Sequence, residues 1–131
     1  MKGKTSLAGV PAYVTKDGSE IRELLHPDHH PVRHQSLAEA VVPVGAGTCL
    51  HRHRASEEIY HLTRGSGMMT LGAERFPVTA GDSVVIPPGT PHRIDNTGGE
   101  PLHMLCCCAR LTPTPTPTCS PTSGLSFPPG H

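Results

Sequence analysis

Apolar residues along this chain come in short runs that glycine and proline interrupt. No run keeps the spacing of three to four residues over the length that an amphipathic helix needs. Runs rich in Val, Ile, Leu and Thr predict strands at 47–53, 58–63, 67–71, 83–86, 91–95 and 102–108. Short strands with turn signals at intervals of about 8–12 residues favour an all-β sandwich or barrel.

The two ends of the chain differ from this middle part. Residues 1–19 are polar and contain glycine, which indicates a loose N-terminal arm. Apolar or alternating stretches then predict strands at 21–25 and 37–44. Residues 110–131 are rich in Thr, Pro and Ser, a composition that cannot build a hydrogen-bonded ladder, so we expect an extended or disordered tail. The predicted barrel therefore occupies residues 20–109.

Composition narrows the class of protein. The chain has 131 residues, the size of one domain. Its 11 Lys and Arg balance 11 Asp and Glu, so charge gives no argument for binding nucleic acid or an anionic membrane. We see no signal peptide in the sequence. A membrane helix needs about 20 consecutive apolar residues, and no stretch of the sequence approaches that length.

The cysteines add a prediction about the compartment. Five is an odd number, and Cys106, Cys107 and Cys108 are consecutive, which makes them poor disulfide partners for one another. We therefore expect a soluble protein in the reducing cytoplasm. Cys106 and Cys108 share one strand face and are predicted to be small buried side chains rather than reactive thiols. Cys49 shares a face with two histidines and is expected in the same cavity.

His51 and His53 are the first two residues of a candidate metal site. Residues two apart on a strand share a face, so His51 and His53 can both point into a barrel. Glu58 follows after a short connection, on the face shared by Tyr60, and a register shift by one residue would present Glu57 instead. His92 comes later, after a rigid segment of prolines and a glycine.

Three imidazoles and a carboxylate suit one divalent transition metal ion, with Fe, Mn, Ni and Zn as candidates. The alternative is a barrel without metal in which these histidines are hydrogen-bonded. Four protein ligands in an octahedron leave two positions open, unlike a closed tetrahedral zinc site. The candidate ligands are therefore His51, His53, Glu58 and His92.

Two long patterns resemble the signatures of the cupin superfamily. They read Gly45-x5-His51-x-His53-x4-Glu58-x6-Gly65 and Gly81-x5-Pro87-x-Gly89-x2-His92-x3-Asn96. Their order and their separation by 15 residues are typical of small single-domain cupins. The resemblance implies a double-stranded β-helix, or jelly-roll barrel, and a metal at the four positions named above.

The remaining histidines have less specific patterns. His61 alternates with Glu58 and should point away from the barrel interior. A second metal cluster among the histidines of 26–34 is conceivable, but their spacing fits no standard ligand pattern. A solvated loop is the favoured interpretation of that segment.

Two functional hypotheses follow. The first is a metal-dependent enzyme acting on a small organic molecule, either dioxygenase-like or isomerase- and decarboxylase-like, with Tyr60 as a candidate catalytic residue. The second is a non-catalytic sensor or a module that binds a small molecule or metal. The chain has no room for a DNA-binding domain, and we expect no nucleic-acid partner. Pairing through sheets in small cupins leads us to expect a homodimer.

Overall fold

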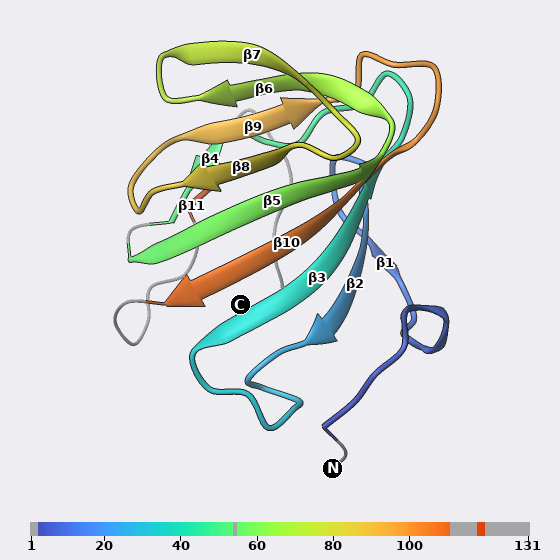
Figure 1. Ribbon diagram of the computed structural model, residues 1–131, viewed down its shortest axis with the longest axis vertical. Coiled ribbons are helices and arrows are strands. Elements are labelled where there is room, and N and C mark those ends of the chain that lie inside the picture. Colours follow the sequence, from blue (N-terminus) through green and yellow to red (C-terminus); the bar gives the residue numbers. More distant parts are fainter. Residues whose placement is uncertain (1–2, 54, 111–117, 120–131) are drawn as a thin grey trace.

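The computed structural model describes residues 3–53, 55–110 and 118–119 of the chain (Figure 1). Within these ranges the fold is all-β apart from one 3-10 turn, η1 (Leu7–Gly9). The strands are β1 (Tyr13–Val14), β2 (Glu20–Leu25), β3 (Gln35–Val42), β4 (His51–Arg52), β5 (Ser56–Arg64), β6 (Ser66–Leu71), β7 (Glu74–Thr79), β8 (Ser83–Ile86), β9 (His92–Asp95), β10 (Leu102–Arg110) and β11 (Thr118–Cys119). The described residues contain no helix long and apolar enough to cross a membrane.

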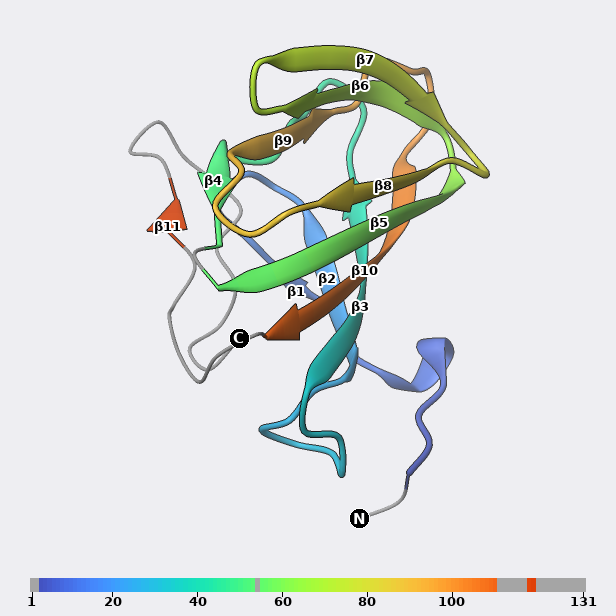
Figure 2. The ribbon, with the colours of Figure 1, turned by 60° about the vertical axis from the view of Figure 1, so that its left-hand side comes forward.

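The strands form two antiparallel sheets (Figures 1 and 2). The first sheet has the order β1-β2-β3-β10-β5-β8, and the second has the order β11-β4-β9-β6-β7. Neighbours in both sheets are mostly distant in sequence: β10 lies between β3 and β5, and β9 lies between β4 and β6. The predicted jelly-roll barrel is confirmed.

The core lies between the two sheets. Ile21, Leu62 and Met104 from the first sheet are fully buried, as are Met69 and Ile94 from the second. These residues belong to a single hydrophobic cluster. Burial alternates strictly along β5, where every second residue from Ser56 to Leu62 is buried. This period of two is the pattern expected of a strand with one face on the core.

Several strands differ from the prediction. The expected strand at 47–53 is regular only at His51–Arg52, although the segment around it is still buried. β7 was not predicted because Glu74, Arg75 and Pro77 do not resemble a strand; β7 lies at a sheet edge, where proline is tolerated.

The chain ends also differ from the prediction. Tyr13–Val14, inside the predicted loose arm, pairs with β2. Thr118–Cys119, inside the predicted tail, pairs with β4. The rest of the tail prediction, residues 111–117 and 120–131, lies outside the described residues. The boundaries of the arm, barrel and tail stay predictions.

The motif glycines occupy positions that need a glycine backbone. Gly65, Gly81 and Gly89 have φ angles of 87°, 98° and 79°, a region that other residues rarely adopt. At Gly65 a Cβ atom would also lie 2.9 Å from the carbonyl oxygen of Pro101. These residues turn the chain before and after the strands that carry the candidate ligands.

The cysteines fall into two groups. Cys106 and Cys108 are free and buried, which confirms their prediction as small packed side chains, while Cys107 on the opposite face is free and exposed. Cys49 is buried and disulfide-bonded. A disulfide does not fit the reducing compartment inferred from the consecutive cysteines, so the cytoplasmic location stays a prediction.

Candidate metal centre

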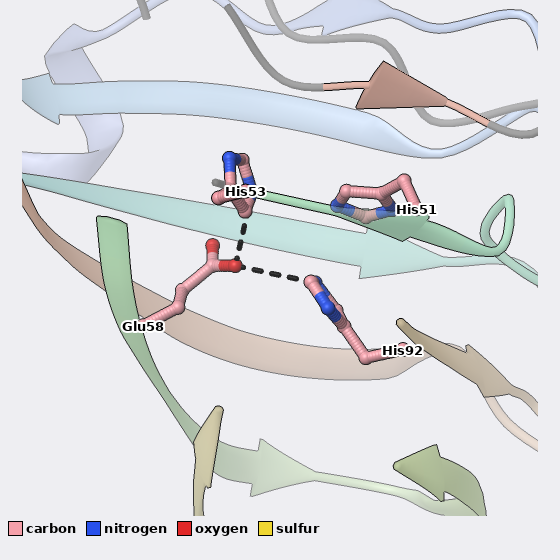
Figure 3. A group of neighbouring side chains, drawn as sticks. All are labelled: His51, His53, Glu58 and His92. Atoms are coloured by element: carbon pink, nitrogen blue, oxygen red, sulfur yellow. Dashed lines mark ion pairs between the residues drawn. The ribbon is translucent and has the colours of Figure 1, made fainter. Parts of the chain in front are cut away.

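Four buried side chains from both sheets converge inside the barrel (Figure 3). His51 on β4 and His92 on β9 are direct cross-strand partners in the second sheet. His53 follows β4, and its backbone carbonyl accepts a hydrogen bond of 2.6 Å from the Gly89 N–H. Glu58 reaches in from β5 of the first sheet. The ligand atoms of all four residues lie within 4.8 Å of one another.

The Glu58 carboxylate lies between His53 and His92 (Figure 3). Its Oε1 is 3.3 Å from Nε2 of His53 and 3.3 Å from Nε2 of His92. These separations exceed the roughly 2.7–2.9 Å of a good charge-assisted hydrogen bond. Neither Glu58 oxygen nor His92 Nε2 has a hydrogen-bond partner among the described residues. The atoms therefore face a common point rather than one another.

Backbone carbonyls hold two of the imidazole rings. Nδ1 of His51 is 2.9 Å from the Cys49 oxygen, and Nδ1 of His92 is 3.0 Å from the Thr90 oxygen. A carbonyl only accepts, so each Nδ1 carries the proton and donates it to these bonds. In that tautomer Nε2 keeps its lone pair, which points into the centre. Such outer contacts orient metal-binding histidines in proteins.

Electrostatics favour the protonation states that a metal ion requires. Burial, reinforced by neighbouring His92, lowers the pKa of His51 from 6.5 to about 4, so this ring is neutral at pH 7. Burial acts to raise the pKa of Glu58, but His53 and His92 outweigh it and hold that pKa far below its usual range. Neutral imidazole and ionised carboxylate are the forms that bind a metal.

The donor set therefore fits a divalent transition metal. Three imidazole nitrogens suit Zn, Fe, Ni or Mn, and the carboxylate adds a negative charge that a cation would balance. A fully buried carboxylate without hydrogen bonds is otherwise costly. Among the described residues, these four are the group of His, Cys, Asp and Glu side chains that can hold an ion. The structure thus brings together all four sequence-predicted ligands.

Register was correctly inferred at Glu58. Glu58 is fully buried and Glu57 is exposed, so the alternative register that points Glu57 inward is wrong. Tyr60, two residues further, is also fully buried, and its ring lies 5.8 Å from that of His92. Its hydroxyl has no hydrogen-bond partner among the described residues.

The other histidines lie outside the centre. His61 points away from the interior, as predicted, and its Nδ1 is 2.8 Å from the Ser83 hydroxyl. His26 differs from the prediction of a solvated loop because it is buried, with Nδ1 accepting a hydrogen bond from the Asp28 N–H. His30 Nδ1 accepts from the His26 N–H. These contacts shape the turn after β2.

Sequence reasoning passed over Tyr13. This residue lies in the segment predicted as a loose arm, and its hydroxyl is buried without a hydrogen-bond partner among the described residues. The signal available was a single tyrosine between apolar neighbours in a chain with two tyrosines. That signal is too weak to identify a two-residue strand.

Comparisons with known proteins agree with this geometry. The cupin domain family matches residues 38–108. An uncharacterized protein of Methanocaldococcus jannaschii is 56% identical over 104 residues, covering 79% of this chain and 83% of that protein. A predicted oxalate decarboxylase of Thermotoga maritima is 26% identical with a TM-score of 0.69, covering 78% and 92%. A sugar phosphate isomerase of Silicibacter pomeroyi, 21% identical with a TM-score of 0.74 over 90% and 82%, shares the fold.

Proposed function

The chain belongs to the cupin family, and on that premise we propose that it is a metal-dependent enzyme for a small oxygen-containing organic molecule. The observation that carries the proposal is the convergence of His51, His53, Glu58 and His92 on one buried point. Burial restricts the substrate to a small molecule. The likeness to a predicted oxalate decarboxylase supports decarboxylase-like chemistry ahead of dioxygenase-like chemistry.

The four ligands and Tyr60 have different proposed roles. The four ligands would hold one Fe, Mn, Ni or Zn ion, which supplies Lewis acidity to a substrate oxygen. Tyr60 is the candidate catalytic residue, because its buried hydroxyl lies on the same strand face as Glu58. Burial, followed by the charge of Glu58, raises the pKa of Tyr60 well above its usual range. The phenol therefore stays protonated and can donate a hydrogen bond or a proton to a substrate oxygen.

Metal identity and turnover test this proposal together. The protein is stripped with a chelator, reloaded separately with Fe, Mn, Ni and Zn, and supplied with a panel of small hydroxy, keto and dicarboxylic acids. We expect turnover with at least one metal, detected as released carbon dioxide or as an isomer by NMR, without oxygen consumption. Tyr60→Phe should lower kcat by roughly 100-fold while metal content is unchanged.

Other results of these experiments would support a different function. Oxygen uptake that requires iron would support the dioxygenase-like alternative. Tight binding of zinc or nickel with no turnover of any compound would support the non-catalytic sensor. Equal activity of Tyr60→Phe and the unaltered protein would remove Tyr60 from the catalytic machinery.

We also infer a homodimer that forms through the outer face of the first sheet. A row of apolar side chains runs across this face from β8 to β2. Each residue in the row is the direct cross-strand partner of the next: Val85, Ile59, Cys107, Leu37 and Leu25. At one end Ile59 and Val85 protrude, with 43% and 54% of their surface exposed. At the other end a hollow of about 210 Å³ is lined by Leu25, Val32 and Leu37.

This row is complementary to itself. Two copies can pack face to face, related by a two-fold axis that runs parallel to the strands and passes Cys107. This axis places the row of the second copy in the opposite direction. The protruding end of each copy then meets the hollow of the other. The neighbouring row, in which His61, Leu105 and Glu39 are successive partners, is reversed too. His61 then lies opposite Glu39 of the second copy. A second copy is therefore the occupant that fits this face.

Light scattering tests the dimer. We expect the unaltered protein to be a dimer and Ile59→Asp to be a monomer, because a charge in the apolar row opposes burial. Leu7→Asp is the matched control, since Leu7 is 46% exposed on η1, outside both sheets, and should leave the dimer intact. Cys107 lies on the axis, so Cys107→Asp should also give a monomer, because it places two like charges opposite each other in the interface. A monomeric unaltered protein would overturn the inference.

A further inference from the structure

A small pocket lies where the loop between β2 and β3 meets the end of the first sheet (Figure 1). Residues 26–27 and 33–36 of that loop and Cys108 line it, and we call it the loop pocket. At this end of the sheet β5 begins, β3 begins and β10 ends, because Cys108 near the end of β10 pairs with both Ser36 and Glu58. The loop pocket and Glu58 therefore lie at the same end of the barrel.

Ser36 and Cys108 line the side of the loop pocket nearest the barrel interior. They are direct cross-strand partners, and Cys108 is in turn the partner of Glu58. Direct partners share one face of a sheet, so these side chains lie on the inner face that carries the metal centre. Adjacent strands are about 4.8 Å apart, so the lining of the pocket begins one strand away from the strand of Glu58.

A hydrogen-bonded turn forms the opposite wall. The buried His26 accepts hydrogen bonds at its carbonyl from the N–H groups of His29 and His30, at 3.0 and 2.8 Å. Its Nδ1 accepts from the Asp28 N–H at 3.0 Å, and its own N–H donates to Nδ1 of His30 at 3.0 Å. These contacts hold the wall in place before a ligand arrives, which lowers the entropic cost of binding.

The lining of the loop pocket favours an anion. Arg33 contributes a permanent positive charge, and none of the lining residues is acidic. Arg33 also takes part in none of the ion pairs found among the described residues. The Ser36 hydroxyl and the His34 ring can add hydrogen-bond donors. The guanidinium is thus a cation without a protein carboxylate to balance it in the described part of the chain.

The size of the loop pocket restricts the anion. Its volume is about 20 Å³, a little more than the roughly 10–15 Å³ that one water molecule needs. A carboxylate is a terminal group of suitable size, and the parallel N–H groups of a guanidinium match its two oxygens. The rest of a substrate has to lie outside the pocket.

We propose that Arg33 in the loop pocket binds the carboxylate of a substrate whose other end reaches the metal centre. This inference rests on the proposed function and specifies its substrate class: small acids with a carboxylate at one end and a second oxygen function at the other. The row of partners Ser36, Cys108 and Glu58 sets the direction in which the substrate lies. Arg33 is then a specificity-determining residue that touches the substrate away from the metal.

Calorimetry with matched ligands tests the inference. Zinc-loaded protein is titrated with succinate, glutarate and adipate, and with the monomethyl ester of each, which keeps the chain but has one carboxylate fewer. We expect at least one diacid to bind roughly tenfold more tightly than its ester, the low end for hydrogen bonds to a charged group because Arg33 is exposed at the rim. Arg33→Gln should abolish this preference and change the affinity of the ester by less than about twofold.

A second arginine provides the matched control. Arg75→Gln makes the same change of charge at an exposed position on β7, at the edge of the second sheet, and should keep the preference for the diacid. Thermal melting shows whether each variant is folded. Equal affinity of every diacid and its ester for the unaltered protein, or an unchanged preference in Arg33→Gln, overturns the inference.

Metal-free protein separates the loop pocket from the metal centre. Acetate should shift the backbone amide NMR signals of His34 and Ser36 in the unaltered protein, and should leave them unshifted in Arg33→Gln. If zinc does not bind but these shifts are seen, the proposed function fails and the carboxylate site stands. Larger shifts with inorganic phosphate than with acetate at equal concentration would overturn the assignment to a carboxylate.

Discussion

Replacing His92 or His51 by alanine is expected to reduce bound metal from one ion per chain to roughly a tenth of that amount or less. Each substitution removes one nitrogen ligand and the carbonyl contact that orients it. It also leaves the fully buried Glu58 carboxylate with one fewer imidazole beside it. Elemental analysis of each purified variant after dialysis measures the loss.

Two neighbouring residues provide matched controls. Glu57→Gln changes the adjacent carboxylate, which is exposed on the other strand face. His61→Ala removes an imidazole from the same strand that points away from the centre. Both variants should retain the metal content of the unaltered protein. If His51→Ala and His92→Ala also retained it, the assignment of the metal centre would be wrong.

The metal-free protein should lose about 3 kcal/mol of stability between pH 6.5 and pH 4 through His51 alone. The pKa of this ring is lowered from 6.5 in the unfolded chain to about 4 in the folded protein. Below pH 6.5 the unfolded state therefore takes up a proton that the folded state does not accept until about pH 4. The unfolded state is thereby favoured as pH falls through this window.

Glu58 acts in the same direction at lower pH. Its folded pKa is depressed, so the stability it contributes is complete above its unfolded pKa of 4.5 and is lost as pH falls below that value. Acid therefore destabilises the metal-free protein first through His51 and then through Glu58. The two effects are distinguishable because their pH ranges are consecutive.

Urea unfolding in chelator at a series of pH values measures this dependence. The unaltered protein should show a falling free energy of unfolding below pH 6.5, and His51→Gln should show a flatter curve over the same range. His61→Gln is the control, because His61 is near the surface and should leave the slope unchanged. Identical slopes for all three proteins would contradict the assigned environment of His51.

The ligand set was predictable because it depends on local rules. Strand parity places His51 and His53 on one side, and the same rule separates buried Glu58 from exposed Glu57. Positive φ angles at Gly65, Gly81 and Gly89 explain why glycine stands at those motif positions. These features extend over a few residues, so the order of amino acids is sufficient to specify them.

Tyr13 could not be predicted for the opposite reason. Its strand has two residues, and its position inside the barrel depends on pairing with β2 and on the closure of both sheets. The edge strand β7 was missed similarly, since its proline and charged residues are acceptable only where one side needs no partner.

The sequence by itself determined an all-β barrel, its two motifs and the identity of four candidate ligands, because periodicity and turn chemistry are local properties. Only the tertiary structure decided that β4, β5 and β9 meet, that Nδ1 of His51 and of His92 bond to carbonyls, and that the Tyr60 ring is buried 5.8 Å from that of His92. Each of these depends on contacts between residues far apart in the chain. Such contacts exist only once the two sheets have packed together and excluded water.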